Sequence, residues 1–326
     1  MELAPKLLKQ IYETMVRTRI LEERLIRMYK QSDGYFWSGG PGEEAFNVPL
    51  GLLVHKGEGL DYDYLHLHYR SCGIVTAMGA EPIDAMRQMK NTALDPYSGG
   101  RNFSNHFAIK KWNIVPVTST IETQYQTAIG TALAQKRHGG RGITIVNGGD
   151  AGTAEGDFAS CLVWASRPQA ELPILIIVTN NEWGISTAAA TQRSSTHIAD
   201  RGRAFGIKTE LVQGNDVWES YNAIHNAMEY VRKERRPFLL EAKVSRLYGH
   251  SSATGCNFIT EEVDCLAEFE KKIIGAGVIS LDEATSFRQA VSDEFLRASQ
   301  QVKQEALPTA ETRYDDVFYG QKGRFW

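Results

Sequence analysis

Polar residues that could bind a metal ion and a phosphate group follow the predicted strands in the middle of this chain. Asp150 comes after a short apolar run at residues 142–146 and is preceded by two glycines. Asn180 and Asn181 follow a longer apolar run at 172–178, and His250 follows a third run at 238–247. Because open parallel sheets bind ligands beyond the carboxyl ends of their strands, we expect these side chains to face one crevice.

The residue types and their spacing favour magnesium and a diphosphate as the ligands of this crevice. A helix expected at 155–166 would begin at the same edge, where free N–H groups and the helix dipole attract phosphate. Magnesium commonly takes only one or two protein carboxylates and completes its octahedron with phosphate oxygens and water. Asp150 alone could be an ordinary turn residue and Asn181 an ordinary cap. Their separation by one strand and one helix indicates a magnesium–diphosphate site.

The elements around these residues predict an α/β fold: a doubly wound, mostly parallel sheet with helices on both faces and helical extensions at both termini. A long amphipathic helix should occupy the first thirty residues, with a glycine-rich turn at 39–42 before the next helix. Asn215 should cap a helix that ends before Pro237, and two more helices are expected at about 261–274 and 281–302. We expect one domain over residues 1–326, with an N-terminal arm at 1–40 and a C-terminal helical region at 261–326.

Composition excludes several classes of protein. Of 326 residues, 42% are hydrophobic and 23% charged, which is typical of a globular protein. The formal net charge is −3, whereas a protein that binds nucleic acid usually carries an excess of positive charge. The longest apolar run is too short to cross a bilayer, and the N-terminus has no secretory signal pattern. Four cysteines fit neither a zinc motif nor a disulfide framework. The expectation is a cytoplasmic, reduced protein that binds neither nucleic acid nor membrane.

Six motifs in order along the chain resemble those of the α subunit of the thiamine-diphosphate-dependent 2-oxo acid dehydrogenases. The stretch Asn-Gly-Gly-Asp-Ala at 147–151, followed by Asn-Asn at 180–181, resembles the thiamine-diphosphate motif that begins Gly-Asp-Gly and ends Asn-Asn. The other motifs are Gly-Glu-Glu-Ala at 42–45, Tyr-Arg-x-x-Gly at 69–73, Gly-Gly-Arg at 99–101 with His106, Arg-x-x-Gly-His-Ser at 246–251 and Asp-Asp-Val-Phe at 315–318. The resemblance covers nearly the whole chain.

The resemblance implies a role for individual residues. Asp150 and Asn181 match side-chain ligands of Mg²⁺, and Trp183 matches the residue that offers its backbone carbonyl. Tyr69 and Arg70 match the pair that binds the diphosphate, a task suited to a planar guanidinium. Three further sets of cofactor-binding residues are implied. Ser119 and Ile121 match the segment at the thiazolium and pyrimidine, and Gly149 and Ala151 match backbone contacts to the diphosphate. His250 matches an active-site histidine. Ser251 matches a serine that is phosphorylated in animal enzymes.

The implied activity is that of an oxidoreductase acting on an oxo group with a disulfide acceptor. It would decarboxylate a small 2-oxo acid and reductively acylate a lipoyl group, as in branched-chain amino acid catabolism. Residues 198–201 and 314–317 look most like branched-chain enzymes. In this family the glutamate that activates the cofactor lies in a β subunit, and no residue of this chain matches it. The implied partners are therefore a β chain, in a heterotetramer of two α and two β chains, and the lipoyl-bearing acyltransferase of a multienzyme complex.

Departures from the family pattern keep other interpretations open. Ala151 replaces the third motif glycine, which is tolerable if φ is negative there, and Glu122 stands where a small residue is usual, which could alter a nearby monovalent-ion site. The acidic pair after His250 is absent. Pyruvate or acetoin dehydrogenase α subunits, the half of a split transketolase-like carboligase, and a non-catalytic scaffold are the alternatives.

Other features carry weaker expectations. His66 and His68 are better explained as structural, whereas His106 is undecided and Arg193 could reach a phosphate. The small residues at 251–255 should make few contacts and order only when cofactor binds. The turn at 39–42 and the segment around Ile121 are expected to meet the partner chain.

Overall fold

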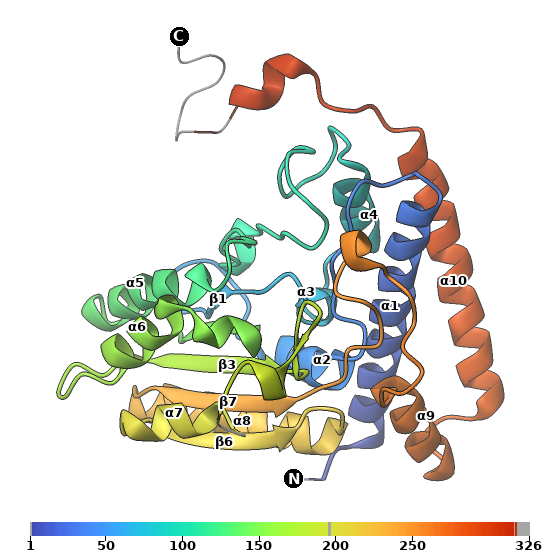
Figure 1. Cartoon of the computed structure of the whole chain (residues 1–326). Helices are drawn as coiled ribbons and strands as arrows, with labels where there is room; N and C mark the ends of the chain where they lie inside the picture. The colour runs from blue at the N-terminus through green and yellow to red at the C-terminus, as the bar shows by residue number, and fades with distance from the viewer. Residues whose placement is uncertain (1, 195–196, 316, 318–326) are drawn as a thin grey trace.

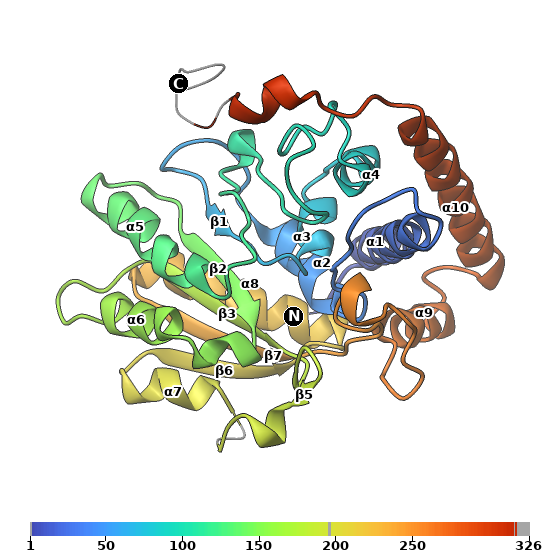
Figure 2. The ribbon, with the colours of Figure 1, turned by 45° about the horizontal axis from the view of Figure 1, so that its top comes forward.

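The computed structural model describes residues 2–194, 197–315 and 317, and this part of the chain contains one five-stranded parallel sheet. Its strands are β1 (Tyr64–His66), β2 (Thr144–Gly149), β3 (Ile174–Asn180), β6 (Lys208–Gln213) and β7 (Phe238–Lys243). They lie in the order β1-β2-β3-β7-β6, with every neighbouring pair parallel (Figures 1 and 2). All four carboxyl ends of β1, β2, β3 and β7 therefore meet at one edge.

Helices cover both faces of the sheet, as the near-continuous apolar strands require. Alternate strand residues such as Val146 and Ile176 pack with α5 (Thr123–Arg137), α6 (Gly156–Ala165) and α7 (Ala199–Ala204). The intervening residues, such as Ile145 and Ile177, pack with α2 (Glu44–Leu53), α3 (Cys72–Ala77) and α8 (Val217–Glu234) on the other face. The predicted doubly wound α/β fold is confirmed (Figure 2).

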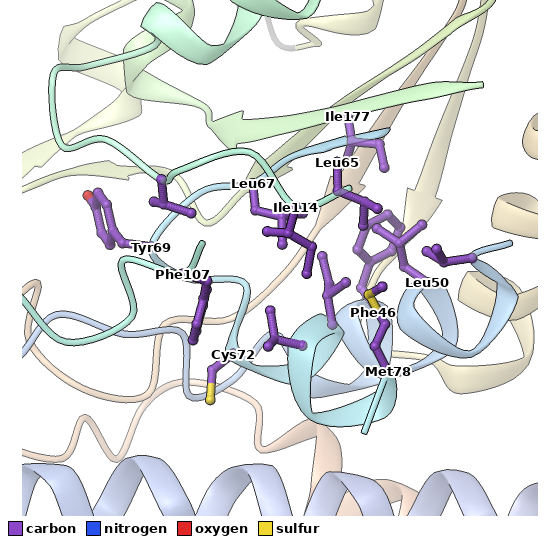
Figure 3. Close-up of a cluster of buried hydrophobic side chains, with 14 of the residues drawn as sticks. Phe46, Leu50, Leu65, Leu67, Tyr69, Cys72, Met78, Phe107, Ile114 and Ile177 are labelled. Atoms are coloured by element: carbon purple, nitrogen blue, oxygen red, sulfur yellow. The ribbon is translucent and has the colours of Figure 1, made fainter. Parts of the chain in front are cut away.

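The core of the second face extends to the edge where the ligand crevice was expected. Phe46 and Leu50 of α2 lie against Leu65 and Ile177 of the sheet, and the cluster continues through Phe107 to Tyr69 (Figure 3). Tyr69 is 6% exposed, so most of its ring belongs to the core, and the residue also reaches the crevice at the strand ends. Packing of this kind fixes the backbone that follows β1.

The terminal helices pack beside the sheet domain. α1 (Pro5–Lys30) runs along α10 (Leu281–Lys303) and contacts α4 (Pro82–Lys90) and α9 (Cys265–Gly275) (Figures 1 and 2). A buried ion pair supports this arrangement: the Arg19 guanidinium donates to both oxygens of Glu44 at 2.7 and 2.9 Å and to Asp264 at 2.8 Å. Because both charges of the Arg19–Glu44 pair are buried, removing either would leave the other uncompensated. How many domains the chain forms stays a prediction.

Several boundaries differ from the sequence expectations. β2 and β3 begin two residues later than the apolar runs and end at Gly149 and Asn180, which places the motif residues at the strand ends. The helix cap expected at Asn215 is wrong: Asp216 accepts from the N–H groups of Trp218 and Glu219. Asn215 instead bonds to Ser245, a contact distant in sequence. No helix in the described ranges is long and apolar enough to span a bilayer.

Candidate functional site

A cavity of about 330 Å³ lies at the carboxyl ends of the strands. All of the candidate cofactor-binding residues except Ser119 line it: Tyr69, Arg70, Ile121, Gly149, Asp150, Ala151, Asn181, Trp183 and His250. They come from the segments after β1, β2, β3 and β7 and from the loop before α5. The topology thus brings distant residues into one crevice. Arg70 and His250, for example, are 180 positions apart in the sequence.

Arg70 and His250 form the hydrogen-bond-donating side of this cavity. Nη2 of Arg70 lies 2.9 Å from Nδ1 of His250, and Nη1 donates to the carbonyl of Gly39. Because a guanidinium can only donate, Nδ1 of His250 accepts and its proton lies on Nε2. Burial, with the charges of Arg70 and Arg246, lowers the pKa of His250 to about 4, so the imidazole is neutral at pH 7. His250 can therefore donate from Nε2 to an anion.

The glycine turn at 39–42 supports Arg70 from inside the protein. A Cβ on Gly40 would lie 2.4 Å from the Arg70 carbonyl oxygen, and a Cβ on Gly39 would lie 2.3 Å from Oε2 of Glu22. Gly42 has φ of +108°, a region that favours glycine. Since these glycines are buried, the expectation that the turn faces a partner is wrong.

Asp150 and Asn181 form the oxygen-rich side. Asp150 follows β2 and is 2% exposed, and Oδ2 of its carboxylate pairs with Nη1 of Arg193 at 2.7 Å. Burial raises the pKa of Asp150, whereas the bond and charge of Arg193 oppose that rise. Asn181 Oδ1 accepts from the N–H of Trp183 at 3.0 Å, which begins the short hairpin of β4 (Trp183–Gly184) and β5 (Thr187–Ala188). This hairpin places Trp183 on the cavity wall.

Ser119 is the candidate that does not line the cavity. Its hydroxyl hydrogen-bonds to Nε2 of His106, whose Nδ1 lies 2.9 Å from the carbonyl of Ser104. His106, whose role the sequence left undecided, thus bonds to the segment that carries Ser119 and Ile121. Ile121 is 48% exposed at the cavity.

The loop after His250 is held more firmly than expected. The N–H of Ser252 donates to the Trp37 carbonyl at 2.8 Å, and the Ser252 hydroxyl accepts from the Trp37 N–H at 3.0 Å. Ser251 and Thr254 form a reciprocal capping box around a short 3-10 turn. Three of these four bonds join a backbone N–H group to a Ser or Thr hydroxyl, so short polar side chains hold the loop. Ser251 and Ser252 are buried, so the expectation of few contacts is wrong for these two residues, whereas residues 253–255 are exposed. That the loop orders when cofactor binds stays a prediction.

Glu122 is a buried carboxyl group in the cavity wall. It has φ of +62° and lies over Gly148 and Gly152, where an added Cβ would come within 2.1 Å of its carboxylate oxygens. Gln124 Nε2 donates to it at 3.1 Å. Burial, with Asp150 and other nearby acids, raises the pKa of Glu122 to about 8. Gly148 in the motif and Gly152 just after it therefore make room for Glu122, which the sequence marked only as a departure from the family pattern.

We expect Glu122→Gln to change the pH dependence of stability. Because the pKa of Glu122 is higher in the folded state, about 8, than the reference value of about 4.3, its contribution to the free energy of unfolding is fully present below pH 4 and is lost as pH rises through 8. The variant lacks this loss, so it should gain stability relative to the parent by up to about 1.4 kcal/mol per pH unit between pH 5 and 8. Urea unfolding across this range measures the difference. Glu234→Gln, at the exposed end of α8, is the control, and parallel curves for Glu122→Gln and the parent would contradict the assignment.

Ala151 is accommodated by the absence of a side chain at Gly184. Ala151 is not among the residues with positive φ, so the condition for tolerating alanine is met. A Cβ built on Gly184 would lie only 2.6 Å from the Ala151 methyl carbon, a distance that real Cβ contacts do not reach. The Ala151 methyl group thus uses the space that Gly184 leaves.

Gly184→Ala should therefore destabilise the site, and Ala151→Gly should rescue it. Overpacking commonly costs about 1–3 kcal/mol, and contacting residues couple by about 0.5–3 kcal/mol in double-mutant cycles. The cycle is measured as free energies of unfolding of the four chains. Gly156→Ala is the matched control, because nothing lies within 4 Å of a Cβ there. Additive effects of the two substitutions would show that the methyl groups do not compete.

Some cavity residues were missed at the sequence level. They are His68, Glu155, Ile185, Thr187 and Gln192. His68 was expected to be structural, but its ring lies 3.8 Å from the ring of Tyr69 and it lines the cavity. His66, in contrast, bonds to Thr127 and Thr131 inside the fold. Arg193, which was expected to reach a phosphate, does not line the cavity and pairs with Asp150.

Of the C-terminal motif, Asp316 and Phe318 lie outside the described residues. Arg101, from the glycine-rich motif, donates to the carbonyl of Asp315 and, at 3.2 Å, to that of Thr312. Two motifs far apart in sequence therefore contact each other.

Comparisons with known proteins agree with the motifs. The family described as "Dehydrogenase E1 component" matches residues 12–311. The 2-oxoisovalerate dehydrogenase subunit alpha of Bacillus subtilis is 32% identical over 242 residues, which are 74% of this chain and 72% of that protein. The mitochondrial subunit alpha 2 of Arabidopsis thaliana is 29% identical over 95% of this chain and 66% of its own length, and the Pseudomonas aeruginosa subunit alpha is 27% identical over 93% and 76%. The motif-based resemblance is thereby confirmed, and the predicted type of subunit agrees with the names of these relatives. This chain belongs to the dehydrogenase E1 component family.

Proposed function

We propose that this chain is the α subunit of a 2-oxo acid dehydrogenase, most similar to the branched-chain type, that binds thiamine diphosphate and Mg²⁺. One observation carries the proposal: the crevice at the strand ends has donors for a diphosphate on one side and oxygens for a cation on the other. Arg70 and His250 make the first side, and Asp150 and Asn181 make the second.

The residues fit an anionic ligand because the cations beside the cavity have neutral partners. Arg70 bonds to a carbonyl and a neutral imidazole, and Nη1 of Arg246 donates to the carbonyl of Ile185 at 2.9 Å. The buried Nε of Arg246 has no hydrogen-bond partner among the described residues. A negatively charged group in the cavity would balance the charge of Arg70 and accept a hydrogen bond from Nε2 of His250, since both residues line the cavity. Gly149 leaves open space on its Cβ side, so the backbone can be approached closely.

The residues also fit the metal that such a diphosphate requires. Asp150 and Asn181 offer a carboxylate and an amide oxygen, and the carbonyl of Trp183 is the third proposed ligand, a set suited to Mg²⁺. When bound, thiamine diphosphate supplies the carbanion chemistry that removes carbon dioxide from a 2-oxo acid. The protein's part is to hold the diphosphate with Tyr69, Arg70 and His250, and to orient the ring portion against Ile121.

A partner chain is part of the proposal, because this chain has no match for the family's activating glutamate. Apolar side chains at the cavity remain exposed: Ile121 is 48%, Trp183 39% and Ile185 52% exposed. A β chain seated on them would exclude water from the reacting centre. We propose two α and two β chains that deliver acyl groups to a lipoyl-bearing acyltransferase. A single domain over residues 1–326 and a cytoplasmic location complete the proposal.

The test is reductive acylation of a lipoyl domain by the α/β complex with 3-methyl-2-oxobutanoate, pyruvate and acetoin as substrates. We expect turnover to be fastest with the branched-chain acid. Fastest turnover with pyruvate or acetoin would reassign the substrate. Carbon–carbon ligation without lipoyl reduction would favour the carboligase, and no cofactor binding by the complex would favour the scaffold.

A further inference from the structure

A chain of buried polar groups lies behind the proposed metal site. Glu241 of β7 accepts from Nδ2 of Asn180 at 2.7 Å and from the N–H of Ala199, at the start of α7, at 2.8 Å. Oδ1 of Asn180 accepts from Nη2 of Arg193 at 3.1 Å, and Nη1 of Arg193 donates to Oδ2 of Asp150 at 2.7 Å. These hydrogen bonds therefore link Glu241 of the sheet, through Asn180 and the Arg193 guanidinium, to the Asp150 carboxylate.

Arg193 pairs with Asp150 but is not among the residues that line the cavity. Both side chains are buried: that of Asp150 is 1% exposed and that of Arg193 is 8% exposed. A charge-assisted bond of this kind fixes the rotamer of the carboxylate. A metal ligand needs this support, because its oxygen atoms must be correctly oriented toward the ion.

Arg193 also joins the two segments that carry the proposed ligands. Asn181 and Trp183 begin the loop after β3, which passes through the β4–β5 hairpin and returns to Arg193. Its fork bonds to Asn180 at the start of this loop and to Asp150 after β2. One side chain thus fastens the loop to the neighbouring strand end.

We propose that Arg193 is the positioning residue of the metal site: it presents the Asp150 carboxylate to the cavity and holds the Asn181–Trp183 loop beside it. The inference rests on the proposed function. It assigns no contact between Arg193 and the cofactor. Groups that orient a metal ligand in this way commonly change metal affinity by about 10–100-fold when they are removed.

The experiment titrates Mg²⁺ into the α/β complex with saturating thiamine diphosphate and follows binding by tryptophan fluorescence, since Trp183 lies in the loop. Arg193→Gln should weaken Mg²⁺ binding by about 10–100-fold. Arg193→Lys keeps the charge but cannot bond to both Asn180 and Asp150 as a fork. Its Mg²⁺ affinity should therefore lie between that of Arg193→Gln and that of the parent. Arg203→Gln, which removes a guanidinium from the exposed pair with Asp200, should bind as the parent does.

A second readout separates positioning from a merely structural role. If Arg193 positions the ligand, excess Mg²⁺ should restore the thiamine-diphosphate affinity of Arg193→Gln to that of the parent. Should Arg193→Gln fail to fold, the same two measurements on Arg193→Lys decide. Unchanged or tighter Mg²⁺ binding would overturn the inference, because it would show that the guanidinium only occupies the metal's place. Cofactor loss that excess Mg²⁺ does not restore would also overturn it. A parent complex that binds no cofactor would instead overturn the proposed function, and the inference with it.

Discussion

Asp150→Asn should abolish magnesium-dependent binding of thiamine diphosphate to the α/β complex while leaving the chain folded. The amide removes the negative charge that a hard cation requires, and it keeps an oxygen that can still accept from Arg193. We expect cofactor affinity in Mg²⁺ to fall at least about 100-fold, the upper end of the effects found for metal sites. Calorimetry with thiamine diphosphate at fixed Mg²⁺ measures this loss.

Comparison with Asp150→Ala separates the effect of Asp150 on cofactor binding from its effect on stability. The sequence implied no structural partner for Asp150, so the alanine variant would be expected to fold normally. The structure provides Arg193 as a partner, and removing one member of a buried ion pair commonly costs about 3–5 kcal/mol. Asp150→Ala should therefore lose both binding and stability, whereas Asp150→Asn should lose binding and less stability, because its amide oxygen can still accept from Arg193. Asp200→Asn, at an exposed pair on α7, serves as the control. Normal cofactor affinity of Asp150→Asn would remove Asp150 from the metal site.

The chain purified alone should release no carbon dioxide from any 2-oxo acid at a useful rate and should gain activity on addition of its β chain. Half of the proposed site is missing without the partner: no activating glutamate is matched, and the cavity remains open beside Ile121 and Trp183. Removing a positioned acid–base group commonly costs about 10²–10⁴-fold in rate. Carbon dioxide release from 3-methyl-2-oxobutanoate and from pyruvate, with and without the β chain, measures the gain.

Substitution of Ile185 by Asp tests this assembly apart from the cofactor contact proposed for Ile121. Ile185 is 52% exposed at the cavity, so a carboxylate there should weaken association with the β chain, and excess β chain should recover part of the activity. Full turnover by the isolated α chain would mean that a glutamate of this sequence activates the cofactor, and the subunit assignment would then be wrong.

The fold could be predicted because its signals are local in sequence. The apolar runs that form β2 and β3 and the helical spacing of α8 each depend on a few neighbouring residues. Contacts between residues far apart in sequence explain where the prediction was wrong. Asn215 and Asp216 are both good helix caps, and the bonds that Ser245 makes to Asn215 leave Asp216 as the cap.

The candidate site was predictable where a residue directly follows a strand. Asp150 and Asn181 stand at the carboxyl ends of adjacent parallel strands, so their proximity follows from the topology. The path of a loop does not follow from the topology. The pairing of Arg193 with Asp150 and the space that Gly184 leaves for Ala151 depend on how the loop after β3 returns, and no local pattern encodes that return.

The burial of all four cysteines bears on the chemistry of the proposed partner. Cys72, Cys161, Cys256 and Cys265 are free thiols inside the fold, and burial raises the pKa of Cys72, Cys161 and Cys265. Thiol–disulfide exchange needs an accessible thiolate, and these buried groups offer little of it. In the proposed function, the chain receives a lipoyl disulfide and releases one of its sulfurs as an acyl thioester and the other as a thiol. Because the four cysteines of the chain are packed in the core, they would not form mixed disulfides with that carrier, and the lipoyl group could react at the cavity without a competing exchange.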